Sequence, residues 1–250
     1  MVNYKNVLFN FKRLINALFL VRNKASFWNF IYLAELTKFN HPVSVSWSQA
    51  GEDVALLSVF KDRTDGLYID VGSHHPSRFS ITRHLYQLGW HGVNVEANPE
   101  LIPEFEKFRK RDLNLCVAVG MRDKYNFTIF EEPALSTFND EWRTKFVNEK
   151  ARVSKTIEIT GRKLRSILDE FEPENAIDLL SIDAEGSDLE VLQSLEGPTL
   201  EIHRFPRWLL LEAAPPVSEA LKTPAVRLAM EWGYTPYFVL PMSTLMKFEG

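Results

Sequence analysis

Cysteine is almost absent from this sequence of 250 residues, because Cys116 is its only cysteine. One thiol excludes an internal disulfide and a metal site built from several cysteines, and it agrees with a reducing, cytoplasmic environment. Cys116 lies in an apolar run, so we expect it to be buried, as free cysteines usually are. A small secreted domain stabilised by disulfides is therefore excluded.

Long apolar runs are also missing. No stretch approaches the roughly 20 apolar residues that a membrane-spanning helix needs, even in the apolar segment 7–39. This segment has no small-residue cleavage site after a compact apolar region, so we do not expect a signal peptide. It combines basic residues with bulky aromatics. Two interpretations stay open, which are packing on the domain or on a second copy, and peripheral contact with the inner face of a membrane.

A general basic excess is missing as well. The formal net charge is −4, which argues against nucleic acid as a partner. Residues 1–46 hold six Lys or Arg and one acid, so they carry +5 and the rest of the chain carries −9. We therefore expect an N-terminal helical extension over residues 1–46 and one α/β domain over residues 47–250.

The glycine motifs that bind phosphates are absent. No Gly-x-x-x-x-Gly-Lys-Ser/Thr loop occurs, and the turn DVGSHHP at residues 70–76 has one glycine. A dinucleotide-binding turn has three glycines at fixed spacing. These absences argue against a phosphate-loop site and disfavour a nicotinamide-dependent enzyme, a hypothesis that tight NADH binding would support.

The pattern that is present alternates short apolar runs with amphipathic stretches, which predicts an α/β fold with a mainly parallel sheet. The predicted strands are residues 66–71, 92–96, 113–119, 177–183 and 208–212. Residues 49–53 lead into a predicted helix that ends near residue 60, and the other predicted helices are residues 80–89, 99–110, 161–171, 188–195 and 217–232. Short strands at 127–130 and 155–160, with a helix-like stretch at 140–150, predict an insertion. Residues 234–240 and 243–248 predict an antiparallel hairpin at the C-terminal edge.

The turn after the first predicted strand is the expected ligand site, because ligands of open α/β sheets bind at the carboxyl ends of strands. Gly72 lets a ligand approach the backbone there. Glu96 ends the second predicted strand, where a carboxylate can accept both hydroxyls of a ribose. A ligand with a ribose but no phosphate fits best, and S-adenosylmethionine is the common cofactor of that description.

A series of short motifs occurs in order between residues 48 and 240. They are SQAGED (48–53), DVGSHHP (70–76), SIT (80–82), LY (85–86), GW (89–90), GVNVEANP (92–99), AVG (118–120), LSTF (135–138) and SIDAEG (181–186). As an ordered set they resemble the FkbM family of methyltransferases. Ile81 stands where many relatives have Asn, and Glu96 where close relatives often have Asp. The resemblance implies a class I, Rossmann-like methyltransferase fold and methyl transfer from S-adenosylmethionine to a hydroxyl.

The resemblance also implies ten cofactor-binding residues. The residues at the methionine end are Gln49, Asp70, Gly72 and Ser73. The residues at the ribose are Glu96, Ala97 and Asn98. The residues that flank the adenine or lie near the cofactor are Ala118, Val119 and Ser136.

Methyl transfer to a hydroxyl requires aligned reactants and removal of the hydroxyl proton. Asp183 ends the fourth predicted strand over the cofactor crevice and is the first catalytic candidate. Glu185 shares this role or orients the acceptor, and Glu212 ends the next strand. His74 can take the proton as a neutral imidazole. A structural role stays open for each, as a helix cap, a first-turn acid, an ion-pair partner or a turn residue.

Asp183 and Glu212 can also hold a divalent cation, which would act on the acceptor hydroxyl as a Lewis acid. Two carboxylates are few protein ligands for a divalent cation, so no metal site is predicted. The expected acceptor is a hydroxyl-bearing small molecule, most simply a sugar in a glycan, a polysaccharide or a glycosylated natural product. Trp142 and Phe146 are candidate contacts for it. The alternative function is a non-catalytic methyltransferase-fold subunit that binds within a larger assembly.

Overall fold

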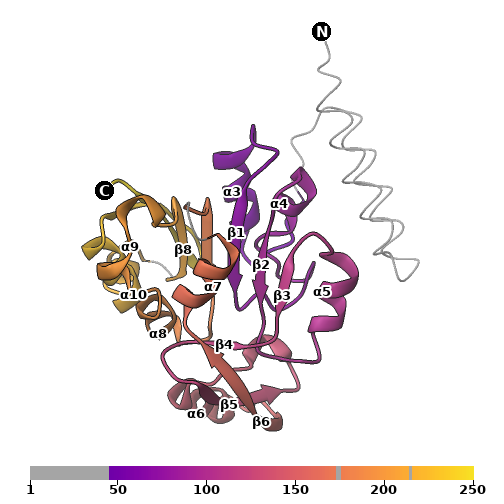
Figure 1. Ribbon diagram of the computed structural model, residues 1–250. Coiled ribbons are helices and arrows are strands. Elements are labelled where there is room, and N and C mark those ends of the chain that lie inside the picture. The colour runs from indigo at the N-terminus through magenta and orange to yellow at the C-terminus, as the bar shows by residue number, and fades with distance from the viewer. Residues whose placement is uncertain (1–44, 173–175, 214–215) are drawn as a thin grey trace. The chain divides into compact units, whose positions relative to one another are not determined.

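The computed structural model describes residues 45–172, 176–213 and 216–250, which contain an α/β domain (Figure 1). The predicted N-terminal helical extension lies outside the described residues except for its last two positions. None of the helices in the described ranges has the length and hydropathy that a membrane crossing requires.

Seven strands form the central sheet in the order β3-β2-β1-β7-β8-β10-β9. Their bounds are β1 Leu67–Val71, β2 His91–Val95, β3 Leu113–Leu115, β7 Leu179–Ile182, β8 Trp208–Glu212, β9 Tyr234–Val239 and β10 Ser243–Phe248. The first five of these pair in parallel, and β10 pairs antiparallel with both β8 and β9. The structure confirms the predicted parallel sheet and its antiparallel C-terminal hairpin.

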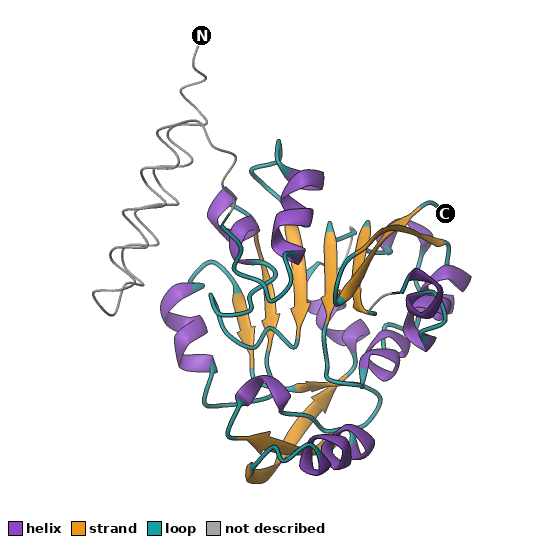
Figure 2. Cartoon of the chain, turned by 180° about the vertical axis from the view of Figure 1, so that it is seen from behind, coloured by secondary structure: helices purple, strands orange, loops and turns teal. Residues whose placement is uncertain are grey.

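Helices cover both faces of this sheet (Figure 2). Their bounds are α3 Glu52–Phe60, α4 Arg83–Leu88, α5 Ile102–Phe108, α7 Leu164–Phe171, α8 Asp188–Gln193, α9 Val217–Ala220 and α10 Pro224–Glu231, with short 3-10 turns at Gly197–Thr199 and Ile202–Arg204. Successive residues of β1 face opposite sides, because side chains alternate along a strand. Tyr68 belongs to the core under α3 and α4, and Ile69 to the core under α7, α8 and α10.

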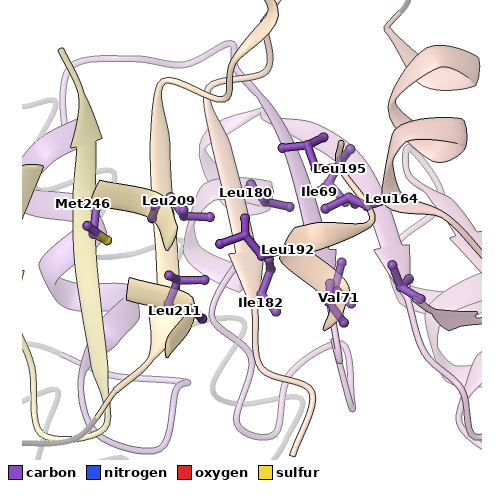
Figure 3. Close-up of a cluster of buried hydrophobic side chains, with 14 of the residues drawn as sticks. Ile69, Val71, Leu164, Leu180, Ile182, Leu192, Leu195, Leu209, Leu211 and Met246 are labelled. Carbon is purple, nitrogen blue, oxygen red and sulfur yellow. The ribbon is translucent and has the colours of Figure 1, made fainter. Parts of the chain in front are cut away.

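The larger of these two cores is shown in Figure 3. Alternate residues of β1, β7 and β8 interdigitate there with side chains of α7 and α8. The labelled residues are Ile69, Val71, Leu164, Leu180, Ile182, Leu192, Leu195, Leu209, Leu211 and Met246, and each is at most 4% exposed. Burial of each such side chain stabilises the fold by about 1.5–3 kcal/mol. This rigid core fixes the strand ends that build the site.

A second, three-stranded sheet has the order β4-β6-β5. It is formed by β4 Ala118–Val119, β5 Lys124–Phe130 and β6 Val153–Arg162, with a 3-10 turn at Pro133–Leu135 and α6 Asp140–Asn148 between β5 and β6. The structure confirms the predicted insertion, which lies beyond the carboxyl ends of the parallel strands (Figures 1 and 2).

The predicted strand 113–119 is wrong as one element. The chain forms β3 in the central sheet, leaves it at Cys116 and Val117, and then forms β4 in the small sheet. It changes sheets because β4 pairs with Gly161 and Arg162 of β6. For the same reason Cys116 is half-buried between the sheets and not fully buried.

The predicted helix 217–232 is also wrong as one element, because α9 ends at Ala220 and α10 begins at Pro224. Proline lacks an N–H donor and disfavours helical backbone at the residue before it. Thr223 accordingly has an extended ψ of 130°. The other predicted helices and strands are present, several of them with shifted ends.

Candidate active site

A cavity of about 590 Å³ lies at the carboxyl ends of the parallel strands. Its lining from the central sheet includes residues that end or follow β1, β2, β7 and β8. The opposite wall comes from β5 and α6, through Phe127, Trp142 and Phe146. The strand order reverses at β1, and the crevice outside such a reversal is where open α/β sheets bind ligands.

Thirteen of the predicted site residues line this cavity. They are Gln49, Asp70, Gly72, Ser73, His74, Glu96, Ala97, Ala118, Val119, Ser136, Asp183, Glu185 and Glu212. The structure places Asn98 outside the lining, where it is buried and its Oδ1 accepts a hydrogen bond from the Glu100 N–H at 3.0 Å. Asn98 thus shapes the turn after β2.

Gly72 joins the turn after β1 to the end of β7. Its φ is +77°, and its N–H donates to the Val95 carbonyl at 2.9 Å. A Cβ atom at this position would lie 1.7 Å from the carbonyl oxygen of Asp183. The position requires glycine for two reasons. A residue with a Cβ disfavours left-handed backbone, and the Cβ would collide with the backbone that follows β7. The backbone after β7 approaches this position closely, and Gly72 also lines the cavity.

Glu96 is buried at the end of β2 with its carboxylate in the cavity wall. One oxygen accepts the His74 N–H at 2.9 Å and the other accepts the Asn98 N–H at 2.6 Å. Burial raises the pKa of Glu96 to about 7, although these N–H donors oppose the rise. Each oxygen retains acceptor capacity, so the carboxylate can accept two more hydroxyls.

Asp70 is held by a buried polar network. It accepts a hydrogen bond from the Thr82 hydroxyl at 2.8 Å, and Arg109 reaches that hydroxyl at 3.3 Å. Arg109 is fully buried and also donates to Ser80 Oγ at 2.8 Å and Tyr68 Oη at 3.0 Å. Burial raises the pKa of Asp70 to about 6, opposed by Thr82 and Arg109. This network fixes Asp70 in position.

Three acids face the cavity from the other side, and we call Asp183, Glu185 and Glu212 the acidic group. Asp183 is exposed because it faces the cavity, but surrounding protein limits its solvation and, with the charge of Glu212, raises its pKa to about 7. Burial, with the charge of Asp183, raises the pKa of Glu185 to about 9. Burial also raises the pKa of Glu212, opposed by Lys145.

The acidic group differs from Asp70 and Glu96 in its hydrogen bonds. Within the described parts of the chain, the three carboxyls of the acidic group form no hydrogen bond and no ion pair. The carboxylates of Asp70 and Glu96 are both bonded to the protein. The cavity therefore has one side whose acids are bonded to the protein and one side whose acids are open to the cavity, without a hydrogen bond to the described residues.

The insertion holds the turn that carries Glu185. Glu185 and Gly186 have φ values of +46° and +86°, an uncommon backbone conformation for a glutamate. The Glu185 carbonyl accepts Thr137 Oγ1 at 3.0 Å, and the Gly186 carbonyl accepts Asn139 Nδ2 at 2.8 Å. Trp142 packs against Gly186, where a Cβ would lie 2.0 Å from Cδ1 of the indole. These contacts keep Glu185 in the cavity wall.

His74 is tied to an ion pair. Its Nε2 lies 3.1 Å from Arg78 Nη1, and the two Arg78 amino groups bind the Glu132 carboxylate at 2.9 and 3.0 Å. Burial and the charge of Arg78 lower the pKa of His74 to about 4. The neutral imidazole can accept from Arg78 at Nε2, and that nitrogen is then already engaged.

Sequence patterns did not point to several polar residues of the lining. They are Arg78, Glu132, Lys145 and Ser243. The position of Lys145 follows from helical spacing, since it stands three residues after Trp142 on α6 and its Nζ lies 4.1 Å from the centre of that indole. The position of Ser243 follows from the pairing of β8 with β10, since Ser243 lies directly opposite Glu212 in that register. The others depend on loop geometry that no local pattern signals.

No group of three or more His, Cys, Asp or Glu side chains is arranged to hold a metal ion within residues 45–172, 176–213 and 216–250. Asp183 and Glu212, the pair considered for a divalent cation, both line the cavity.

Several solved structures are similar to this chain at low sequence identity. A TehB-like SAM-dependent methyltransferase from Corynebacterium glutamicum is 11% identical, with a TM-score of 0.41, and the match covers 91% of this chain and 100% of that chain. The precorrin-6y C5,15-methyltransferase from Geobacter metallireducens is 13% identical, with a TM-score of 0.43 and coverage of 79% and 87%. The 1,6-didemethyltoxoflavin-N1-methyltransferase from Burkholderia thailandensis, solved with S-adenosylhomocysteine, is 8% identical, with a TM-score of 0.41 and coverage of 80% and 77%.

The comparison with curated proteins gives no match. The sequence profile of the methyltransferase FkbM domain matches residues 70–232, which is more than half of the chain. The sheet order, with its antiparallel C-terminal hairpin, is that of the class I methyltransferase fold. The resemblance found in the motifs is confirmed: this chain belongs to the FkbM family of S-adenosylmethionine-dependent methyltransferases.

Proposed function

We propose that the protein transfers a methyl group from S-adenosylmethionine to a hydroxyl oxygen of a sugar in a glycan, a polysaccharide or a glycosylated natural product. The observation that carries this proposal is the acidic group, whose carboxyls face the cavity without a hydrogen bond or ion pair to any described residue. Such groups are available to accept hydrogen bonds from a ligand or, when protonated, to donate one. A sugar supplies several hydroxyl donors, and its apolar face suits the wall formed by Trp142 and Phe146.

The other side of the cavity suits the cofactor. Glu96 has the acceptor capacity for the two ribose hydroxyls, since its protein partners are two backbone N–H groups. Ala118 and Val119 are buried apolar residues of the lining, as the flat adenine requires. Asp70 and Ser73 stand beside Gly72 for the methionine end. When bound, S-adenosylmethionine supplies an electrophilic methyl group on a positively charged sulfur, and an acid-rich cavity accommodates that charge.

Asp183 is the proposed proton acceptor for the acceptor hydroxyl. Its pKa of about 7 lets it be ionised near neutral pH and still accept a proton. Glu185, with a pKa of about 9, is protonated at neutral pH and can donate a hydrogen bond that orients the acceptor. Glu212 shares the wall and accepts hydrogen bonds when ionised. His74 stays neutral and helps to hold Arg78 and Glu132.

The rate of methyl transfer should depend on pH in two steps. Asp183 must be ionised to accept the proton, so kcat should rise with pH through about 7, the raised pKa of Asp183. Glu185 must be protonated to donate, so kcat should fall again through about 9, the raised pKa of Glu185. A pH–rate profile at saturating substrates measures both steps.

The variant Glu185→Gln separates the two steps of the profile. Its amide donates at every pH, so the fall on the alkaline side should disappear while the rise through about 7 remains. Glu149→Gln, an exposed position at the end of α6, is the matched control and should leave the profile unchanged. A rate that does not change with pH across both steps would count against these roles.

The acceptor class is tested by incubating the protein with methyl-labelled S-adenosylmethionine and a panel of methyl glycosides and oligosaccharides. We expect label on an oxygen of at least one sugar, located by NMR. Label on nitrogen or carbon contradicts the proposal. Tight cofactor binding without transfer to any acceptor favours a non-catalytic subunit instead.

Residues 1–46 lie almost wholly outside the described ranges, so their role is a further part of the proposal. Their charge of +5 and their aromatic residues favour peripheral contact with anionic lipid. The rest of the chain carries −9, so anionic lipid does not attract it. The full chain should float with anionic vesicles at low salt, and a form that begins at residue 47 should not. Equal flotation of both forms would leave packing or self-association as the role of this segment.

A further inference from the structure

Two side chains of neighbouring strands face the acceptor side of the cavity together. Glu212 ends β8 and Ser243 begins β10, and the two residues are direct partners in the antiparallel register. The Ala213 N–H donates to the Met242 carbonyl at 3.0 Å, so Glu212 and Ser243 form a non-hydrogen-bonded pair. Side chains of such a pair lie on one face, with Cα atoms about 4.5 Å apart.

The pair has hydrogen-bonding capacity that the protein does not use. Ser243 is 7% exposed, and its hydroxyl bonds to no other group in the described residues. Glu212 is likewise without a hydrogen bond or ion pair in these residues. Both side chains line the cavity. A hydroxyl of a buried residue that faces the cavity without a protein partner is available to a ligand, which supplies its hydrogen bond when bound.

The hydrogen-bonding groups of Glu212 and Ser243 determine which group of a ligand they bind. A serine hydroxyl donates and accepts, and an ionised carboxylate accepts, so together they complement another hydroxyl group. A phosphate or carboxylate on the acceptor would be repelled by the ionised carboxylates of Glu212 and its neighbour Asp183. Lys145 is the nearby cation, and its charge opposes the rise in the pKa of Glu212. The pair therefore favours a neutral polyol over an anion.

We propose that Glu212 and Ser243 form an acceptor subsite that binds a second hydroxyl of the sugar, separate from the hydroxyl that Asp183 deprotonates. This inference rests on the proposed function and deepens it. The acceptor class is then a neutral saccharide with at least two free hydroxyls. Anionic sugars such as uronic acids and sugar phosphates are poor acceptors. Ser243 determines specificity and takes no part in the transfer step.

The test uses methyl glycosides and their monodeoxy analogues as acceptors, with labelled S-adenosylmethionine. With the glycoside that the wild type methylates best, Ser243→Ala should raise KM about tenfold and leave kcat within about twofold. The deoxy analogue that lacks the second hydroxyl should show the same raised KM with the wild type. Ser243→Ala should not raise the KM for that analogue further, because the substitution and the missing hydroxyl remove the same contact.

Matched variants separate binding from folding. Ser243→Thr keeps the hydroxyl and should retain a KM near that of the wild type. Ser166→Ala, at an exposed serine of α7, should behave as the wild type throughout. The affinity for S-adenosylhomocysteine and the thermal unfolding of Ser243→Ala should be unchanged, which shows an intact cofactor site and fold.

Two failures are distinguishable. A wild type that methylates a glycoside, with Ser243→Ala equally active at low acceptor concentration, overturns the subsite and leaves the proposed function standing. The subsite is also overturned if Ser243→Ala raises the KM for every deoxy analogue by the same factor as for the parent glycoside, because no analogue then lacks the contact that Ser243 makes. A wild type that methylates none of the glycosides contradicts the proposed function, and the subsite with it.

Discussion

Replacing Asp183 by Asn should lower kcat for methyl transfer by about 10²–10⁴-fold, the usual contribution of a general base. The amide keeps the size of the side chain but cannot accept the hydroxyl proton. Asp183 forms no hydrogen bond with the described protein, and its contact with Gly72 is made by the backbone, so the fold should not change. Rates measured with saturating labelled cofactor and the sugar that the wild type accepts give the comparison.

The control for this variant is Asp140→Asn, at an exposed acid in the first turn of α6. It removes an acid from the same part of the protein without touching the cavity. Asp183→Asn should bind S-adenosylhomocysteine within about threefold of the wild type, because a lost base affects the transition state and not cofactor binding. A variant that retains a tenth or more of the wild-type kcat would show that another group accepts the proton.

Replacing Gly72 by Ala should destabilise the protein by about 2–5 kcal/mol. A left-handed backbone costs a residue with a Cβ about 1–2 kcal/mol, and overpacking costs about 1–3 kcal/mol more. The second cost arises because the new methyl group would lie 1.7 Å from the Asp183 carbonyl oxygen. Urea unfolding followed by far-UV circular dichroism measures the free energy of unfolding. This loss is a large part of the 5–15 kcal/mol that stabilises a typical domain.

Gly51 supplies the matched control for Gly72. Its φ is +90°, but a Cβ there would meet no atom within 4 Å. Gly51→Ala should therefore show the backbone cost alone, about 1–2 kcal/mol. Equal losses at both positions would mean that the turn after β1 does not pack on β7 as described, and the assignment of Gly72 as the residue that joins these strands would fall.

The sequence predicted the strands and the mainly parallel sheet well because buried strands and amphipathic helices have distinct periods. Ile69, Leu180 and Leu209 stand in short apolar runs bounded by turn residues, and each is in the core. The closing hairpin at residues 234–248 was equally clear, since its two strands are adjacent in sequence. Local pattern and tertiary structure agree at these elements.

Local sequence pattern does not indicate which of the two sheets a strand joins. Residues 113–119 form one apolar run, but the chain passes from the central sheet to the small sheet within it. The choice depends on β6, which lies more than 30 residues later in the sequence. The break between α9 and α10 could have been predicted, because Pro224 is visible in the sequence and disfavours a continuous helix.

The site could be predicted where its residues end parallel strands. Gly72, Glu96, Asp183 and Glu212 follow from this rule, since carboxyl ends of parallel strands meet at one edge. Ser243 and Lys145 enter the cavity from a hairpin and from the inserted helix. Their positions require knowledge of register and packing. The partners of His74 could not be predicted either, because Glu132 comes from a loop far along the chain.

The most direct test of the central claim is calorimetric titration of S-adenosylhomocysteine into the wild-type protein and into Glu96→Ala. We expect micromolar binding by the wild type and a loss of about 10–100-fold in the variant, since a charged acceptor contributes about 1.5–3 kcal/mol. Glu96→Gln should lose part of this affinity, and Glu106→Ala, at an exposed position of α5, none. Equal affinity of Glu96→Ala and the wild type, or no binding by the wild type, would contradict the assignment of this cavity as the cofactor site.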